Sequence, residues 1–395
     1  MRILFLSTDF KPRPGGIAEL SHQIAAALAR HGHALTVVTD KRTEPGWDDG
    51  AQPYAIRRCL DVRRFPRLRT FRGMLEAPLW NSRAARQIRQ TLAGAGIDAV
   101  LAGNYHRLWL RALASYAGPF FCVLHGEDVA SAAATRVPGR KAQMRRTLLR
   151  ATHVFANSRH TAGQACTLLP NACLPVSVIG CGVPLDSIRP IPPARPDSDA
   201  TGPVLLSVAR LVRRKGIDTT LRAVNLLADR YPGLRYVVVG DGPDRAELEA
   251  LARALALNDR VEFTGYVDDT RKHELYAASD LFVMPSRPGA AGECEGFGIS
   301  LLEANAHGLA VVGSRVGGIP DAVANGENGI LVEPNDIAAL AAALAQLLDD
   351  PAARRRMAVA GQTRIREKYN WEMIARTVEA RMLETSGVTD RRDSC

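Results

Sequence analysis

Residues 204–243 read VLLSVARLVRRKGIDTTLRAVNLLADRYPGLRYVVVGDGP. The short apolar run at Val204–Val208 predicts a buried strand. A polar loop over Arg210–Gly216 separates this strand from Ile217–Tyr231, where apolar residues recur at helical spacing. A second β-branched run at Tyr236–Val239 ends in a Gly-Asp-Gly-Pro turn. The order strand, loop, helix, strand therefore predicts a βαβ unit with parallel strands.

The same order of elements opens the chain. A strand is expected at Ile3–Ser7, and a loop rich in proline and glycine follows it. Helical spacing over Ile17–His31 and a β-branched run at Ala34–Thr39 complete the unit. Because alternating strands and helices build parallel sheets with helices on both faces, the predicted fold class is α/β. We expect two Rossmann-like, doubly wound parallel-sheet domains.

A polar, proline-rich stretch divides the two halves. It covers residues 189–201 and is predicted to be an interdomain linker. The expected domains are then 1–188 and 202–370, facing each other across a cleft. Ligands of such sheets bind at the carboxyl ends of the strands, so the cleft is the expected site.

Composition excludes several classes of protein. Of the 395 residues, 46% are hydrophobic and 23% charged, as in soluble globular proteins and unlike disordered or collagen-like chains. No apolar run reaches the roughly 18 residues of a membrane-spanning helix, and no signal peptide is expected. The seven cysteines form an odd set without a CxxC pair. This predicts a reducing, cytoplasmic location without a disulfide framework.

The net charge of +10 is concentrated in the first half of the chain. Between Arg57 and Arg89, ten arginines accompany only Asp61 and Glu76. A second basic run includes no acidic residue and consists of Arg136, Arg140, Lys141, Arg145, Arg146 and Arg150. Such a surface is either an ordinary solvated face or a docking face for an anionic membrane or an acidic substrate. Nucleic acid is not expected as a partner, because no nucleic-acid-binding motif accompanies the charge.

Residues 285–321, PSRPGAAGECEGFGISLLEANAHGLAVVGSRVGGIPD, carry the richest motif. A loop dense in glycine, proline and acid precedes a helix that is expected to begin near Gly298. Glu295 and Glu303 are eight residues apart and cannot share one face of a continuous helix. With Glu295 on the loop and Glu303 on the helix, both can face one ligand beside the free amides of the helix start. The structural alternative is helix capping and compensation of the helix dipole.

This segment resembles the E-x7-E motif of retaining glycosyltransferases of family four, which have the GT-B fold. EGFGISLLEA followed by GGIPD is similar to the pattern of phosphatidylinositol mannosyltransferase-like group 1 glycosyltransferases. The resemblance implies that Glu295 binds sugar hydroxyls of a nucleotide-sugar donor and that Glu303 binds its ribose. It also places the donor phosphates at four backbone amides, those of Gly298, Ile299, Ser300 and Leu301.

Two further elements fit the same resemblance. Arg210 and Lys215 follow the first strand of the second half, where cations suit a diphosphate. The resemblance assigns both to the donor diphosphate, whereas ordinary surface charge is the alternative. Tyr266 and Val267 lie where members of the family contact the nucleotide base. Trp371 marks a closing helix, expected over 371–388, that in this fold returns to the first domain.

The N-terminal half, which would select the acceptor, matches less closely. Gly15 and Gly16 close the first βα loop and would let backbone approach a ligand, although a tight turn also explains them. His125 follows the apolar strand Phe120–Leu124. A lone histidine there is more often structural, but the resemblance places it near the reacting carbon of the sugar.

The resemblance implies retaining transfer of a hexose from GDP-mannose or a UDP-hexose to a hydroxyl of a lipid-linked, glycan or small-molecule acceptor. The predicted catalytic residues are His125, Arg210, Lys215 and Glu295, and the predicted donor-binding residues are Gly16, Arg210, Lys215, Tyr266, Val267, Glu295, Gly298, Ile299, Ser300, Leu301 and Glu303. No cofactor or metal is expected, since the D-x-D at Asp197–Asp199 lies in the linker. Peripheral attachment to the inner face of the cytoplasmic membrane fits the basic patch.

Three alternatives remain. A dinucleotide-dependent oxidoreductase is disfavoured, because G-x-G-x-x-G is missing after both first strands. A GT-B relative with other chemistry, such as a sugar-nucleotide epimerase or a phosphorylase, would share the same motifs. A non-catalytic nucleotide-sugar-binding protein would not need all four of Arg210, Lys215, Glu295 and Glu303.

Overall fold

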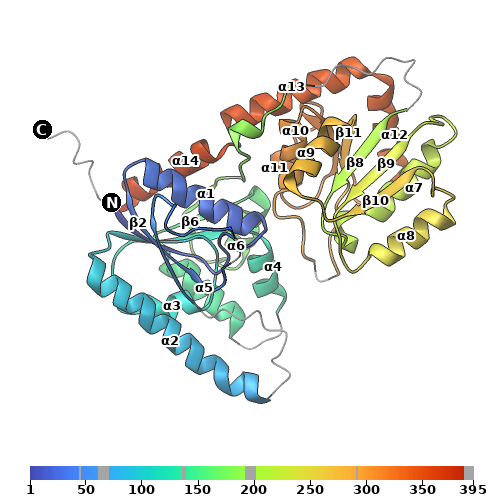
Figure 1. Cartoon of the computed structure of the whole chain (residues 1–395). Helices are drawn as coiled ribbons and strands as arrows, with labels where there is room; N and C mark the ends of the chain where they lie inside the picture. The colour runs from blue at the N-terminus through green and yellow to red at the C-terminus, as the bar shows by residue number, and fades with distance from the viewer. Residues whose placement is uncertain (44–45, 61–70, 136–138, 192–201, 291, 387–395) are drawn as a thin grey trace, which may run out of the picture. The chain divides into compact units, whose positions relative to one another are not determined.

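The computed structural model describes residues 1–43, 46–60, 71–135, 139–191, 202–290 and 292–386. The chain forms two compact units (Figure 1). One comprises Met1–Ile179 together with the chain from Trp371 onward, and the other comprises Gly180–Asn370. No helix in the described part of the chain is long and apolar enough to cross a membrane.

The first unit is built on a seven-stranded sheet with the order β3-β2-β1-β4-β5-β6-β7. All neighbouring strands are parallel. Its elements are β1 (Arg2–Leu6), α1 (Gly16–Arg30), β2 (Ala34–Asp40), β3 (Ala55–Leu60), α2 (Phe71–Ala95), β4 (Ala99–Ala102), α3 (Leu108–Ala112), β5 (Phe120–Leu124), α4 (Glu127–Ala134), α5 (Arg140–Arg150), β6 (His153–Ala156), α6 (Arg159–Thr167), β7 (Val176–Val178) and α14 (Trp371–Ser386).

The second unit contains a six-stranded sheet with the order β10-β9-β8-β11-β12-β13, and its strands are again all parallel. Its elements are η1 (Leu185–Ser187), β8 (Val204–Val208), η2 (Arg213–Lys215), α7 (Ile217–Leu227), β9 (Arg235–Val239), α8 (Arg245–Ala254), β10 (Val261–Gly265), α9 (Asp269–Ala277), β11 (Leu281–Met284), α10 (Ile299–Ala306), β12 (Ala310–Ser314), α11 (Ile319–Ala322), β13 (Gly329–Val332), α12 (Ile337–Asp349) and α13 (Pro351–Glu367).

Both sheets have a strand order of the doubly wound type, which confirms the predicted fold class. The central strands β4 and β11 are apolar throughout, because helices cover both faces of each sheet. In the second unit α7 and α12 pack together on one face, whereas α10 and α13 pack together and against β12. Each sheet therefore presents its loops, and not its faces, for binding.

The structure places β8 at the predicted Val204–Val208. The following helix, however, ends at Leu227, four residues before the predicted Tyr231. A further helical turn follows, because the Tyr231 amide donates to Leu227 O at 2.9 Å, and Pro232 then disfavours helical backbone at Tyr231.

The units divide at other residues than the sequence predicted. The first crossing between units lies at Ile179 and Gly180, not at 188. The Val183 amide donates to Tyr369 O (2.9 Å), and the Arg189 amide donates to Ala306 O (2.9 Å). These bonds hold residues from 183 to 189 within the second unit, while 192–201 of the predicted linker lie outside the described residues.

The chain returns to the first unit at Trp371, where α14 packs against α1. His31 anchors this contact, because its two ring nitrogens lie 2.7 Å from Glu379 Oε2 and 2.8 Å from Glu372 Oε1. His33 adds a contact of 2.7 Å between Nε2 and Glu379 Oε1.

Candidate functional site

The loop after β11 brings Glu295 against two cations. Lys215 Nζ lies 2.5 Å from Glu295 Oε2, and Arg214 contacts the same oxygen at 3.7 Å. The side chains of Lys215 and Glu295 are only 12% and 14% exposed. Burial alone would raise the pKa of Glu295, but the charges of Lys215 and Arg214 hold that pKa below its usual value. Glu295 is therefore a carboxylate at neutral pH.

The backbone at Glu295 is held by the two glycines of the GGIPD segment. The Gly318 amide donates to Glu295 O at 2.9 Å. Gly317 adopts φ +57°, and a Cβ there would collide with Glu295 O and with Cys294 Cβ. Only glycine meets both demands, so the segment positions Glu295 from a loop more than twenty residues further along the chain.

Lys215 is fixed by a tight turn packed against the end of β11. The turn η2 ends in Gly216 at φ +71°, where a Cβ would collide with Pro285 O. The Arg287 amide donates to Arg214 O at 2.8 Å. This packing delivers the lysine ammonium to the carboxyl end of the sheet, as the sequence motif suggested.

Helix α10 begins beside this ion pair. Gly298 precedes the helix at φ +93°, and no side chain caps the helix start. The Leu301 amide donates to Gly298 O at 3.0 Å, so this predicted phosphate ligand is already bonded within the turn. The amides of Ile299 and Ser300 precede the first intrahelical bond and have no intrahelical acceptor. Ser300 Oγ and Lys215 Nζ both contact Met284 Sδ, at 3.3 and 3.8 Å. Lys215, Glu295 and the α10 start thus converge on the end of β11, a constellation suited to an anion carrying hydroxyl groups.

Glu303 lies further along α10 and has a different set of partners. Tyr276 Oη donates to Glu303 Oε2 at 3.2 Å. Burial lowers the pKa of Lys272, but the neighbouring Glu303 and Asp269 carboxylates raise it overall, and Tyr266 contributes in the same direction. Lys272 therefore interacts electrostatically with Glu303 and Tyr266, two of the predicted donor-binding residues.

The remaining predicted residues of this unit are more open. Arg210 follows β8 and is exposed, and no ion pair to it occurs among the described residues. Its loop is anchored by bonds from the Ala209 amide to Val239 O (3.0 Å) and from the Leu211 amide to Asp241 O (2.9 Å). Tyr266 is 85% exposed and Val267 is half-buried after β10.

In the first unit, His125 lies at the carboxyl end of β5. Its Nε2 lies 2.7 Å from Gly103 O, and its amide donates to the Asp128 carboxylate at 3.2 and 3.3 Å. Because a carbonyl only accepts, Nε2 carries the proton and Nδ1 remains an acceptor when the ring is neutral. Burial raises the pKa of Asp128. Asn157 Nδ2 donates to His125 O at 3.2 Å, so strand ends β4, β5 and β6 meet here.

Gly15 and Gly16 form the start of α1, as predicted. Gly15 adopts φ +131°, and no atom lies within 4 Å of the position of a Cβ. The strain of that backbone, and not crowding, favours glycine at residue 15. The open backbone of Gly15 and Gly16 leaves room for a ligand.

Two family models cover most of the chain. The model described as Glycosyltransferase Family 4 matches residues 14–187, and the one described as Glycosyl transferases group 1 matches residues 191–364. A GDP-mannose-dependent α-(1-6)-phosphatidylinositol monomannoside mannosyltransferase of Mycolicibacterium smegmatis is 33% identical over 97% of each chain. The chain belongs to the group 1 glycosyltransferases.

Other relatives and solved structures agree with this assignment. The Mycobacterium tuberculosis protein of the same description is 30% identical over 95% of this glycosyltransferase and 96% of its own length. A glycogen synthase of M. tuberculosis is 29% identical over 95% of this chain and 92% of its own length. Sucrose-phosphate synthase of Thermosynechococcus elongatus has a TM-score of 0.77 at 24% identity and covers 98% of this chain and 100% of its own. The fold is therefore that of the two-domain, Rossmann-like GT-B proteins.

Several site residues of the glycosyltransferase were not predicted as such. Arg214 contacts the same carboxylate oxygen of Glu295 as Lys215 does. Tyr276 donates a hydrogen bond to Glu303, and the charge of Glu303 acts on Lys272. Nothing in the sequence around Tyr276 indicated a contact with Glu303. The basic pair Arg213–Arg214 beside Lys215 was the one signal that could have indicated Arg214.

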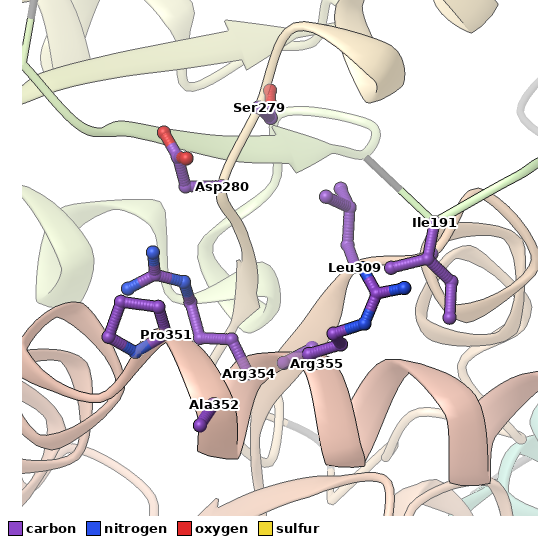
Figure 2. Close-up of a pocket in the computed structure, with 10 residues that line it drawn as sticks. Ile191, Ser279, Asp280, Leu309, Pro351, Ala352, Arg354 and Arg355 are labelled. Carbon is purple, nitrogen blue, oxygen red and sulfur yellow. The ribbon is translucent and has the colours of Figure 1, made fainter. Parts of the chain in front are cut away.

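The glycosyltransferase also has cavities outside this constellation. One of about 300 Å³ lies before β11 and β12, at the opposite edge of the sheet from Met284. Arg354 and Arg355 line it from α13, with Arg355 beside Leu309 and Ile191 (Figure 2). Another of about 210 Å³ lies beside the Lys215 turn and is lined by Arg213, Asp218 and Arg287, among others. The described residues contain no cluster of His, Cys, Asp and Glu that could hold a metal ion.

Only part of the predicted basic surface lies among the described residues. Arg63, Arg64, Arg67 and Arg69, the side chain of Arg72, and Arg136 lie outside the described residues. Arg58 binds Asp49 through two contacts of 2.7 Å, and Arg150 donates to Tyr116 O at 2.6 Å. Helix α5 has an exposed basic face, which consists of Arg140, Lys141, Arg145 and Arg146. Leu149 of the same helix is 61% exposed.

Proposed function

We propose that this glycosyltransferase transfers mannose from GDP-mannose, with retention of anomeric configuration, to a hydroxyl of a lipid-linked acceptor. One observation carries the donor: the mannosyltransferase of M. smegmatis, GDP-mannose-dependent by its description, matches nearly the full chain at 33% identity. The geometry agrees with a sugar diphosphate, because Lys215, Glu295 and the uncapped α10 start meet at one strand end.

Lys215 and Glu295 hold each other in the absence of a donor. On donor binding, Glu295 accepts hydrogen bonds from sugar hydroxyls and the Lys215 ammonium turns to the diphosphate. Arg210 adds a second cation, and the amides of Ile299 and Ser300 bind the phosphate oxygens. These groups stabilise the negative charge that develops on the leaving GDP, which is the main catalytic effect.

The chemical step proceeds on one face of the sugar. The bond between the anomeric carbon and the β-phosphate oxygen breaks as the acceptor oxygen attacks from the same side. The acceptor proton passes to the departing phosphate oxygen, so no protein nucleophile is required. His125 Nδ1 accepts a hydrogen bond from a sugar hydroxyl and orients the ring, since its Nε2 is bound to Gly103 O. No metal takes part in this step.

The acceptor side is assigned to the first unit. The basic face of α5 and the exposed Leu149 suit the surface of an anionic bilayer, each cation contributing about 1 kcal/mol near the membrane. We therefore place the enzyme at the inner face of the cytoplasmic membrane, next to a lipid-linked acceptor.

Glucosyl transfer is the second candidate. It is favoured by the M. tuberculosis glycogen synthase, which is 29% identical over 95% of this chain. A glucosyl donor would occupy the same residues and would differ from mannose in the hydroxyls that meet Glu295 and His125.

The test begins with thermal unfolding in millimolar GDP, UDP, ADP or NAD, in the presence of a chelator. A ligand at 100 times its Kd adds about 2.7 kcal/mol of stability. Stabilisation by GDP, followed by chelator-resistant mannosyl transfer from GDP-mannose to a membrane lipid extract, supports the proposal. Stabilisation by UDP or ADP alone favours the second candidate, and a response to NAD alone overturns both.

A further inference from the structure

Glu303 is held at both of its ends by aromatic residues. At its backbone, the amide and Nδ1 of His307 both bond to Glu303 O, at 3.1 and 2.7 Å. At its carboxylate, Tyr276 Oη donates to Oε2 at 3.2 Å. The carboxylate is thus tied to a group outside its own helix, because Tyr276 belongs to α9.

Tyr276 has little freedom to move. Its side chain is fully buried, and its ring stacks on His307 with centroids 4.5 Å apart and planes 19° apart. Phe282 of β11 lies against it with centroids 6.0 Å apart. Burial and the charge of Glu303 raise the pKa of Tyr276 well above its usual value. The phenol therefore stays protonated and acts as a fixed donor.

The His307 ring that stacks on Tyr276 is uncharged. Because Glu303 O only accepts, His307 Nδ1 carries the proton and Nε2 accepts from His273 Nδ1, 2.7 Å away. Burial lowers the pKa of His307 to about 4, so the ring is neutral at physiological pH. The Tyr276 ring therefore stacks on a neutral partner, which keeps the position of the ring constant.

We propose that Tyr276 is a positioning residue for the ribose of the donor, acting through Glu303. By holding Oε2, it fixes the rotation of the carboxylate so that the ribose hydroxyls meet a preorganised acceptor. This inference rests on the proposed function and on the ribose contact that the family resemblance implies for Glu303. Without the phenol, the carboxylate rotates and donor binding weakens, while the reacting centre near Glu295 and Lys215 is unchanged.

The test compares GDP with 2′,3′-dideoxy-GDP, which lacks both ribose hydroxyls. Tyr276→Phe keeps the ring and its stack on His307 and removes only the donor. We expect its affinity for GDP to fall about tenfold, as for a lost hydrogen bond to a charged group, and its affinity for dideoxy-GDP to remain that of the wild type. The KM for the sugar donor rises by the same factor with little change in kcat.

Tyr236→Phe is the matched control. Tyr236 is also fully buried in this sheet, but its Oη bonds to Ser207 Oγ at 2.8 Å. The melting temperatures of the two variants compare the structural effects of losing a phenol, and Tyr236→Phe should still distinguish the two nucleotides as the wild type does.

Two results distinguish a failure of the role of Tyr276 from a failure of the ribose contact of Glu303. One result is that Glu303→Gln abolishes the preference for GDP while Tyr276→Phe retains that preference or lowers the affinity for both nucleotides equally. In that case the role of Tyr276 is wrong and the ribose contact stands. If the wild type does not distinguish the nucleotides, both are overturned.

Discussion

Lys215 Nζ lies 2.5 Å from Glu295 Oε2, although the two residues are separated by eighty positions in the chain. The pair is mostly buried and is held from both sides, by Gly216 against Pro285 and by Gly317 against Glu295 O. Removing one member of a buried pair leaves the other uncompensated. The predictions below follow from this arrangement and from its neighbours.

Lys215→Ala should lower kcat for mannosyl transfer by roughly 10² or more, because one preorganised charge on the leaving diphosphate is lost. Initial rates with saturating GDP-mannose measure it. Arg235→Ala is the control, since Arg235 forms an exposed surface pair with Glu262 in the same unit. Turnover of Lys215→Ala near that of the control would remove Lys215 from the mechanism.

Glu295→Gln should reduce stability in a pH-dependent way. A carboxylate whose pKa is lowered on folding contributes stability above its unfolded pKa, and this contribution is lost as pH falls through the folded pKa. For Glu295 the unfolded value is near 4.5. The stability advantage of the wild type should therefore be complete at pH 7 and shrink below pH 4.5, as followed by urea unfolding. A constant difference across that range contradicts a charged, paired Glu295.

His307 should also make stability fall on acidification, at less acidic pH than Glu295 does. Its pKa falls to about 4 on folding, against an ordinary value of 6.5. Between these values the unfolded chain binds the proton and the folded chain does not, so stability should fall as pH drops from 6.5 to 4. His307→Phe keeps the ring that stacks on Tyr276 and should make the unfolding free energy less dependent on pH in this window. An unchanged slope would show that His307 does not titrate as described.

Gly317→Ala should destabilise the second unit by about 1–3 kcal/mol, because an alanine at φ +57° is strained. It should also weaken GDP binding, because the new Cβ would displace Glu295 O. Gly326→Ala separates the two causes. Gly326 also has a positive φ, +83°, but no atom lies within 4 Å of its Cβ position. It should lose stability while keeping GDP binding, and equal loss of binding in both variants argues against an anchoring role for Gly317.

The double substitution Arg145→Glu/Arg146→Glu should weaken binding to anionic vesicles. The binding free energy should become less favourable by about 1 kcal/mol for each cation lost from the membrane surface. Sedimentation with phosphatidylglycerol vesicles at low salt measures the binding. Arg253→Glu, an exposed arginine of α8 in the other unit, is the control. Equal binding of both variants and the wild type would overturn the docking role of α5.

The sequence indicated local elements well and long-range pairs poorly. The strand at Val204–Val208 was predicted to the residue, because a β-branched apolar run bounded by Pro203 and a cationic loop has one plausible structure. The end of α7 was missed by four residues, since apolar spacing continues to Tyr231 through a last turn that lies outside the regular helix.

The candidate site shows the same division. Glu295 and Lys215 were selected by resemblance, but their direct pairing depends on two turns that only the packing of the sheet brings together. The bond from Tyr276 to Glu303 joins two helices and has no signature in either. The boundary at Ile179 was hidden as well, because the prolines that suggested a linker lie beyond it and the hydrogen bonds of Val183 and Arg189 decide the division.

The return of α14 to α1 also sets the order in which the protein can be assembled on the ribosome. The second unit is one continuous stretch, Gly180–Asn370, and all of it has been synthesised before Trp371 is added. The first unit lacks the carboxylates that meet His31 and His33 until Glu372 and Glu379 emerge. Domains fold as units during synthesis, usually the N-terminal one first. Here the unit that contains residue 1 is completed only after the whole of the second unit has been synthesised.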